Sequence, residues 1–241
     1  MSVLDELVAT ARTRALPEGE VPLRGPSRFA DALLRLPGGR IRVIAEVKRG
    51  SPSQGSIRLD ADAVQVACAY VRQGAAAISV LTEPTRFGGS FEDLRAVAAA
   101  VSVPVLCKDF IDRPEHLRAA AVCGASAALL MVRVVGARLQ ALIDVARGYG
   151  MEPLVEVHSA DELRIALAST ARVIGVNNRD LSTLRIDRRA GESVLAAVPN
   201  DRIRVAESGY AGVEDIIGLD ADAVLIGTAL MRDSTLLGRM A

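Results

Sequence analysis

Two lysines and one carboxylate are the residues of this chain best suited to moving protons. Only two of its 29 lysines and arginines are lysines, Lys48 and Lys108. A guanidinium stays charged, whereas the pKa of an ammonium can be tuned by its surroundings. Each lysine ends an apolar run, and Glu46 precedes Lys48 by two residues, so these two share a strand face. We expect both lysines to be functional, with a solvated ion pair as the alternative for Glu46 and Lys48.

Further polar residues follow other apolar runs in the same way. Where two of them are two positions apart in the sequence, they lie on one face of a strand and can point into one cavity. Any single member could be a solvated charge at the end of a strand, but the whole set predicts a polar site. The set consists of Glu46, Lys48, Ser51 and Ser53, then Lys108 and Phe110, Glu156, Asn177 and Arg179, and Glu207 and Ser208.

Small residues after the last two apolar runs predict an anion site. One run ends in Glu207-Ser208-Gly209 and the other in Ile226-Gly227-Thr228. Small side chains let backbone N–H groups approach an anion closely, and the last two strand-to-helix loops of a (β/α)8 barrel often bind phosphate. Either glycine alone could be an ordinary turn glycine. Together they favour a phosphate monoester, over which the loop 51–56 could close.

Alternating strand and helix patterns supply the elements that would position these residues. Apolar, β-branched runs predict strands, and amphipathic segments between them predict helices. The expected strands are Arg42–Lys48, Ala76–Leu81, Val103–Lys108, Ala127–Val132, Pro153–Val157, Arg172–Asn177, Ile203–Ala206 and Ala223–Ile226. The expected helices are Ala61–Arg72, Phe91–Ala100, Pro114–Cys123, Ala137–Tyr149, Ala160–Ser169, Arg188–Val198 and, briefly, Gly212–Leu219.

An internal repeat favours closure of these strands into a (β/α)8 TIM barrel. Four similar strand entries place an alanine at the same point, namely Ala75, Ala125, Ala171 and Ala221, which are 50, 46 and 50 residues apart. Each spacing is about two strand–helix units, as expected for a barrel whose quarters repeat. An open doubly wound sheet is the alternative, but the chain has no GxGxxG turn. We expect one α/β domain over residues 1–241.

The first forty residues precede the repeating part. Apolar residues at helical spacing predict a helix over Ser2–Thr13 with Ser2 as its N-cap. A loop with Pro17 and Pro26 follows, and then a second helix over Phe29–Leu36. We expect residues 1–40 to form a helical extension packed on the barrel.

Composition excludes several classes of function. The formal net charge is zero, without a basic block, which argues against a nucleic-acid partner. No apolar run reaches the length of a membrane span, so we expect no membrane partner and a cytoplasmic location. Three cysteines without paired spacing are expected to be reduced. The two histidines are His116 and His158, which form no metal signature, and we interpret His158 as structural.

Seven motifs, taken together, resemble indole-3-glycerol phosphate synthases. In chain order they are EVKRGSPSQG, VLTEPTRFGGSFEDL, PVLCKDF, EPLVEVH, IGVNNRDL, VAESG and LIGTALMR, within residues Ala30–Arg232. The resemblance implies the conversion of 1-(2-carboxyphenylamino)-1-deoxyribulose 5-phosphate to indole-3-glycerol phosphate in tryptophan biosynthesis. It also implies that the partner is this small phosphorylated substrate and that no cofactor or metal is needed. The expected assembly is a monomer or a weak homo-oligomer.

The same resemblance implies roles for individual residues. Lys108 is the expected general acid on the substrate ketone and Glu156 the expected general base, while burial and nearby charges pull the pKa of each lysine in opposite directions. Glu46 and Lys48 are candidates for dehydration. The implied catalytic set is Lys108, Glu156, Lys48, Glu46, Asn177 and Glu207. Substrate binding is implied for Arg179, Ser208, Phe87, Phe110 and Leu129, and phosphate binding for Ser51, Gly209, Gly227 and Thr228.

Two departures from the family pattern leave alternatives open. The seventh helix is about three residues short, which could loosen the phosphate end. Gly50 replaces a bulkier residue, which could free the first loop. The alternatives are a paralogue with this activity in a specialised indole pathway, a phosphosugar isomerase on the same barrel, and a catalytically silent barrel.

Overall fold

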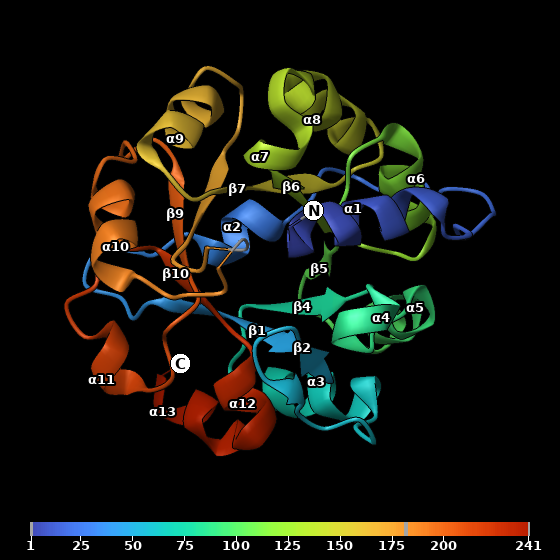
Figure 1. Cartoon of the computed structure of the whole chain (residues 1–241). Coiled ribbons are helices and arrows are strands. Elements are labelled where there is room, and N and C mark those ends of the chain that lie inside the picture. The colour runs from blue at the N-terminus through green and yellow to red at the C-terminus, as the bar shows by residue number, and fades with distance from the viewer. Residues whose placement is uncertain (1, 181–182, 241) are drawn as a thin grey trace.

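The computed structural model describes residues 2–180 and 183–240 and contains a closed barrel of parallel strands in the order β1-β10-β9-β8-β7-β6-β5-β4 (Figure 1). This confirms the predicted (β/α)8 fold, and no strand end differs from the prediction by more than two residues. The barrel strands are β1 Arg42–Val47, β4 Ala77–Leu81, β5 Val105–Lys108, β6 Ala127–Met131, β7 Glu152–Val157, β8 Val173–Asn177, β9 Ile203–Glu207 and β10 Ala223–Ile226.

Helices follow the strands and surround the barrel (Figure 1). The predicted helices are confirmed, with ends shifted by two residues at most, except that the second helix ends at Leu33 rather than Leu36 and the helix expected to end at Leu219 ends at Ile216. The helices are α1 Val3–Thr13, α2 Phe29–Leu33, α3 Ala63–Arg72, α4 Pro84–Phe87, α5 Phe91–Ala100, α6 Pro114–Val122, α7 Val132–Val135, α8 Leu139–Gly148, α9 Ala160–Leu167, α10 Arg188–Ala196, α11 Val213–Ile216, α12 Thr228–Arg232 and α13 Leu237–Met240.

Several short elements were not predicted. They are the four- and five-residue helices α4, α7, α12 and α13, the 3₁₀ turns Gly136–Arg138 and Ser234–Leu236, and a hairpin of β2 (Gly50–Ser51) and β3 (Gly55–Ser56). The hairpin contains the loop that was expected to move more freely because of Gly50. An added Cβ at Gly50 would lie 3.2 Å from the carbonyl oxygens of Arg86 and Gly55, and the greater freedom of the loop stays a prediction.

The core has two apolar layers, as alternation along a barrel strand requires. The inner layer fills the barrel with residues such as Ile44, Leu106 and Leu154. The outer layer lies between strands and helices and includes Val43 and Ala45, the neighbours of Ile44. The four repeated alanines are all buried, which agrees with the internal repeat.

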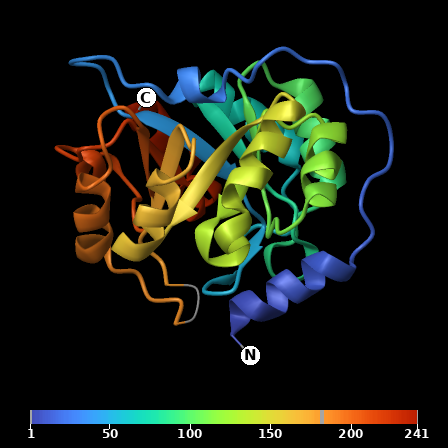
Figure 2. The same cartoon turned by 90° about the horizontal axis from the view of Figure 1, so that it is seen from above.

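The N-terminal extension reaches both ends of the barrel (Figure 2). Helix α1 lies beside the loops at one end, and the chain then runs along the outside to α2 at the other. Ser2 caps α1 in a capping box with Asp5, as predicted for its N-cap. At the other end of α1, the Arg14 guanidinium pairs with the buried Asp109, and the Arg12 Nε lies 2.5 Å from Asp112 Oδ2. These contacts fix the helix to the loop that follows β5.

Candidate active site

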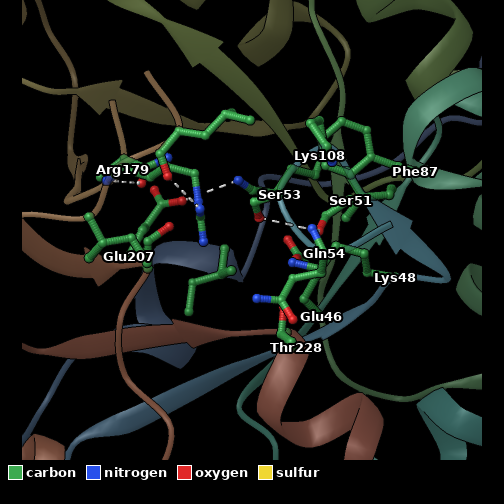
Figure 3. A pocket seen from close by; sticks show the side chains of 18 of the residues that line it. Glu46, Lys48, Ser51, Ser53, Gln54, Phe87, Lys108, Arg179, Glu207 and Thr228 are labelled. Atoms are coloured by element: carbon green, nitrogen blue, oxygen red, sulfur yellow. Dashed lines mark hydrogen bonds and ion pairs between the residues drawn. The ribbon is translucent and has the colours of Figure 1, made fainter. Parts of the chain in front are cut away.

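All the predicted site residues line one cavity of about 330 Å³ at the carboxyl ends of the barrel strands. Figure 3 shows side chains from β1, the hairpin, β5, β9 and α12 around this space. The structure therefore brings together residues far apart in the sequence. They are Glu46, Lys48, Ser51, Phe87, Lys108, Phe110, Leu129, Glu156, Asn177, Arg179, Glu207, Ser208, Gly209, Gly227 and Thr228.

The two residues that end β1 form an ion pair inside the cavity. Lys48 Nζ lies 2.9 Å from Glu46 Oε1, and the Ser79 hydroxyl donates to the other oxygen of Glu46 at 3.4 Å. Burial by itself raises the pKa of Glu46, but the ammonium groups of Lys48 and Lys108 outweigh burial and lower it. Glu46 is therefore a carboxylate, and Lys48 is held at a fixed place beside it.

Lys108 lies between two buried carboxyl groups. Its Nζ is 3.2 Å from Glu207 Oε2 and 3.6 Å from Glu156 Oε2. Burial by itself lowers the pKa of Lys108, but Glu207, Glu156 and Glu46 outweigh it and raise the pKa above its usual range. The structure thus settles which of the two opposed effects prevails: Lys108 is an ammonium at neutral pH.

The surroundings of Glu156 and Glu207 shift the pKa values of these two carboxyl groups in opposite directions. Burial raises the pKa of Glu207 to about 8, and repulsion from Glu156 adds to this effect although Lys108 opposes it. Burial also raises the pKa of Glu156, but Lys108 and His158 outweigh it and hold the pKa below its usual range. At pH 7 Glu207 carries a proton and Glu156 does not. Two carboxyl groups with opposed protonation are a common arrangement for acid–base work.

The ends of β8 and β9 add hydrogen-bonding groups. Asn177 Oδ1 accepts from the Arg179 backbone N–H at 3.0 Å, and Arg179 Nη1 donates to the Leu184 carbonyl at 2.9 Å. Ser208 has a φ of 66°, which is uncommon for a residue other than glycine. The Asn178 amide donates to the Ser208 carbonyl at 2.8 Å and holds this turn. Leu181 of the NNRDL motif lies outside the described residues.

Small residues form another part of the cavity lining. They are Ser51, Gly209, Gly227 and Thr228, and α12 begins at Thr228. A side chain at position 227 has no room, because an added Cβ would overlap Glu46 Oε1 and lie 3.0 Å from Lys48 Nζ. The hairpin is tied to α12, since Arg232 Nη2 donates to Gln54 Oε1 at 2.5 Å.

An apolar wall lies around Phe87 and Phe110, whose ring centroids are 6.2 Å apart with an interplanar angle of 43°. Leu129 lines the same cavity. Val3, Leu4 and Leu7 of α1 also line it, although the sequence placed this helix only against the body of the barrel. Asp109 and Tyr210 were missed as well. Asp109 follows Lys108 directly and is 2% exposed, a signal that becomes visible only once burial is known.

His158 was interpreted as structural, and the structure gives it a closer relation to the site. Its Nε2 lies 3.2 Å from Glu156 Oε1, although His158 itself does not line the cavity. Among the described residues no group of three or more His, Cys, Asp or Glu side chains could hold a metal ion. In the same part of the chain, no helix is long and apolar enough to cross a membrane.

The fold is that of a (β/α)8 barrel, and its cavity brings ionisable side chains and small residues together, as in the enzymes of this class. The family model described as indole-3-glycerol phosphate synthase matches residues 10–238. Among curated proteins, the indole-3-glycerol phosphate synthase of Deinococcus radiodurans is 50% identical over 225 residues, covering 89% of this chain and 84% of that protein. The indole-3-glycerol phosphate synthase of Mycolicibacterium vanbaalenii is 44% identical over 243 residues, covering 95% of this chain and 89% of that protein.

The chain belongs to the indole-3-glycerol phosphate synthase family, which consists of carboxy-lyases of tryptophan biosynthesis. A solved structure of thiamine phosphate pyrophosphorylase from Pyrococcus furiosus shares the fold, with a TM-score of 0.61 and 14% identity over 83% of this chain and 91% of that one. At this identity the likeness concerns the fold alone. The family match favours the synthase over the phosphosugar isomerase that the sequence left open.

Proposed function

We propose that this protein converts 1-(2-carboxyphenylamino)-1-deoxyribulose 5-phosphate to indole-3-glycerol phosphate, with the site residues acting in the roles that follow. One observation carries the assignment: Lys108 Nζ lies between the buried carboxyl groups of Glu156 and Glu207, at 3.6 and 3.2 Å, in one cavity. Proton donor and acceptor are thus within about 4 Å of each other at the place where the substrate ketone would react. The family membership supports the same reaction.

In the first step Lys108 donates a proton to the ketone oxygen of the substrate. The aromatic carbon that bears the carboxylate attacks the ketone carbon, and a carbon–carbon bond forms. Loss of the carboxylate as carbon dioxide returns the bonding electrons to the ring. A positioned acid of this kind accelerates such a step by roughly 10²–10⁴-fold. The raised pKa of Lys108 keeps the proton available at neutral pH.

The second step removes the new hydroxyl group as water and requires both an acid and a base. Glu156 is the proposed base, because it is ionised although buried. Glu46 and Lys48 form a second acid–base pair at 2.9 Å and are the candidates for assisting dehydration. Asn177 and the neutral Glu207 are proposed to hold the substrate's oxygen atoms by hydrogen bonds.

The substrate is proposed to lie with its phosphate at Ser51, Gly209, Gly227 and Thr228 and its ring against the apolar wall. Backbone N–H groups at Gly209 and at the start of α12 suit an anion. Phe87, Phe110 and Leu129 suit an aromatic ring. Arg179 and Ser208 also line the cavity and are proposed to contact the substrate.

The Glu156→Gln variant tests the proposed base. Glutamine has nearly the same size but cannot accept the proton, so the single-turnover rate should fall by about 10²-fold or more with little change in KM. The rate is followed by the fluorescence of the indole product. Glu152→Gln is the matched control, because Glu152 begins the same strand at the opposite end of the barrel and pairs with Arg147. A Glu156→Gln rate within a few-fold of wild type at every pH would remove Glu156 from the mechanism.

We further propose that the protein acts in the cytoplasm, as a monomer or a weak homo-oligomer, in the primary tryptophan pathway. Its three cysteines are free thiols, which suits a reducing compartment. A paralogue that serves a specialised indole pathway would have the same catalytic residues. A catalytically silent barrel is disfavoured, because the acidic, basic and anion-binding residues lie together in one cavity.

A further inference from the structure

A row of alternating charges runs from the cavity into the barrel wall behind Glu156. Its members are Lys108 on β5, Glu156 and His158 at the end of β7, Glu162 on α9 and Arg133 on α7. His158 Nε2 lies 3.2 Å from Glu156 Oε1, and His158 Nδ1 lies 3.2 Å from Glu162 Oε2. Arg133 Nε donates to Glu162 Oε1 at 3.0 Å. The catalytic reaction as described above uses only the first two members of this row.

The imidazole of His158 is placed by its own backbone and by α9. Ser159 caps α9, and its hydroxyl accepts from the Glu162 backbone N–H at 3.2 Å. Glu162 Oε2 in turn accepts from the His158 backbone N–H at 2.8 Å. The side chain of His158 is only 4% exposed. The ring therefore has one orientation, with a carboxylate facing each of its nitrogen atoms.

This arrangement requires the doubly protonated form of the ring. A neutral imidazole has one N–H group, so one of its nitrogen lone pairs would face a carboxylate at 3.2 Å. Burial by itself lowers the pKa of His158, and Arg133 adds to this, but Glu156 and Glu162 outweigh both and raise the pKa to about 9. The contact with Glu156 is an ion pair rather than a linear hydrogen bond.

We propose that His158 is a positioning residue that acts through Glu156. Held as an imidazolium by Glu162, it keeps Glu156 ionised and thereby leaves the proton of the Glu156–Glu207 pair on Glu207. This inference rests on the proposed role of Glu156 as the base. Without the cation behind it, Glu156 would keep Lys108 and Glu207 as its charged neighbours, and its pKa would move up toward that of Glu207. A protonated Glu156 could not accept a proton from the substrate.

The first test compares single-turnover rates of wild type and His158→Gln across pH. An opposite charge at this distance shifts a carboxyl pKa by about 1–3 units. The acidic limb of the variant's profile should therefore move up by at least about one pH unit, so that the rate falls on that limb and recovers at higher pH, with a KM within a few-fold. A rate lowered equally at all pH values would mean that His158 has only a structural role, and an unchanged profile would also overturn the proposal.

A second test needs no change at the site and no activity. The chain has two histidines, and burial lowers the pKa of the other one, His116. In ¹⁵N NMR spectra of histidine-labelled wild type at pH 7, His158 should give an imidazolium signature and His116 that of a neutral ring. In Glu162→Gln the pKa of His158 should fall by about one unit or more. A neutral His158 at pH 7 in the wild type would overturn the proposal even if the His158→Gln variant failed to fold.

The double variant Glu156→Gln/His158→Gln separates this inference from the proposed function. If His158 acts through Glu156, the second substitution should not slow the Glu156→Gln enzyme by more than about 2-fold. A further loss of 10-fold or more would show that His158 acts independently of Glu156. If Glu156→Gln alone kept wild-type turnover, the proposed function of Glu156 would fail, while the NMR signature of His158 would still report its charge.

Discussion

At the scale of single residues, the scarcity of lysine in the sequence identified the centre of the site. Lys48 and Lys108 both line the cavity, and each contacts a carboxyl group at 2.9 and 3.2 Å respectively. Arginine serves elsewhere as the general cation of this chain, for example in the pair of Arg49 with Asp93. The two lysines occur where we propose that a proton is released, which a guanidinium does poorly.

The variants Lys108→Ala and Lys108→Arg test this interpretation. Both should lower kcat by about 10²–10⁴-fold, because neither provides a suitable proton donor to the ketone. Arginine keeps the positive charge beside Glu156 and Glu207, so the fold and the ionisation of Glu156 should be preserved in that variant. Circular dichroism serves as the control for folding, and turnover of a folded Lys108→Arg enzyme within a few-fold of wild type would contradict the role of Lys108.

Sequence patterns identified the residues of the site but not all of their relations. Residues at strand ends must converge in a closed parallel barrel, so Glu46, Asn177 and Glu207 could be assigned without coordinates. His158 could not, because its importance depends on Glu162, which approaches it from helix α9. The protonation of Glu207 also depends on burial and on the distance to Glu156, and neither can be derived from spacing.

At the scale of elements, the periodic segments were predictable and the short ones were not. Strands such as β8 and helices such as α5 have enough residues for a pattern to be recognised. Helix α4 has only four residues and depends on Glu83, whose carboxylate accepts from three backbone N–H groups. Isolated helices of that length are unstable. Their formation is decided by such contacts, which the local sequence does not reveal.

Helix α1 is the element whose role was most underestimated. Its apolar face was expected to cover the barrel, and Val3, Leu4 and Leu7 in fact form part of the cavity wall. The other end of the helix is fixed to the β5 loop by Arg12 and Arg14. Helix α1 thus connects the cavity wall formed by Val3, Leu4 and Leu7 with the segment that follows Lys108.

The variant Leu4→Ala tests whether α1 takes part in substrate binding. Removal of a few apolar carbons from a pocket wall costs about 1–3 kcal/mol of binding, so KM should rise roughly 10-fold while kcat changes little. Leu34→Ala is the matched control, since Leu34 follows α2 at the other end of the barrel and is 51% exposed. Equal KM values for the two variants would mean that α1 does not contact the substrate.

At the scale of the whole molecule, the fold holds ionisable groups in states that they would not keep in the unfolded chain. Glu207 is protonated up to a pKa of about 8, compared with 4.5 for an ordinary glutamate. His158 is charged up to about 9, compared with 6.5. Both groups bind protons more tightly in the folded state, so their contribution to stability is greatest at low pH and is lost as pH rises.

The free energy of unfolding should therefore fall with increasing pH over two overlapping ranges. From pH 5 to 8 the unfolded state has lost the proton of Glu207 while the folded state keeps it, and between pH 6.5 and 9 the same holds for His158. A group that is fully protonated in the folded state and fully deprotonated in the unfolded state contributes a slope of about 1.4 kcal/mol per pH unit. His116 acts in the opposite direction near pH 6.5, because its lowered pKa makes the unfolded state bind more protons, and this effect fades about one pH unit higher.

Urea unfolding of wild type, His158→Gln and Glu207→Gln at half-unit steps from pH 5 to 9 measures these slopes. Glu207→Gln should flatten the curve mainly below pH 8, and His158→Gln should flatten it mainly between pH 6.5 and 9. Each variant is the control for the other, because both remove one buried proton site from the same cluster. A wild-type curve that rises or stays flat from pH 6.5 to 9 would contradict both pKa directions, since a group that binds protons more tightly in the folded state can only lose stability over that range.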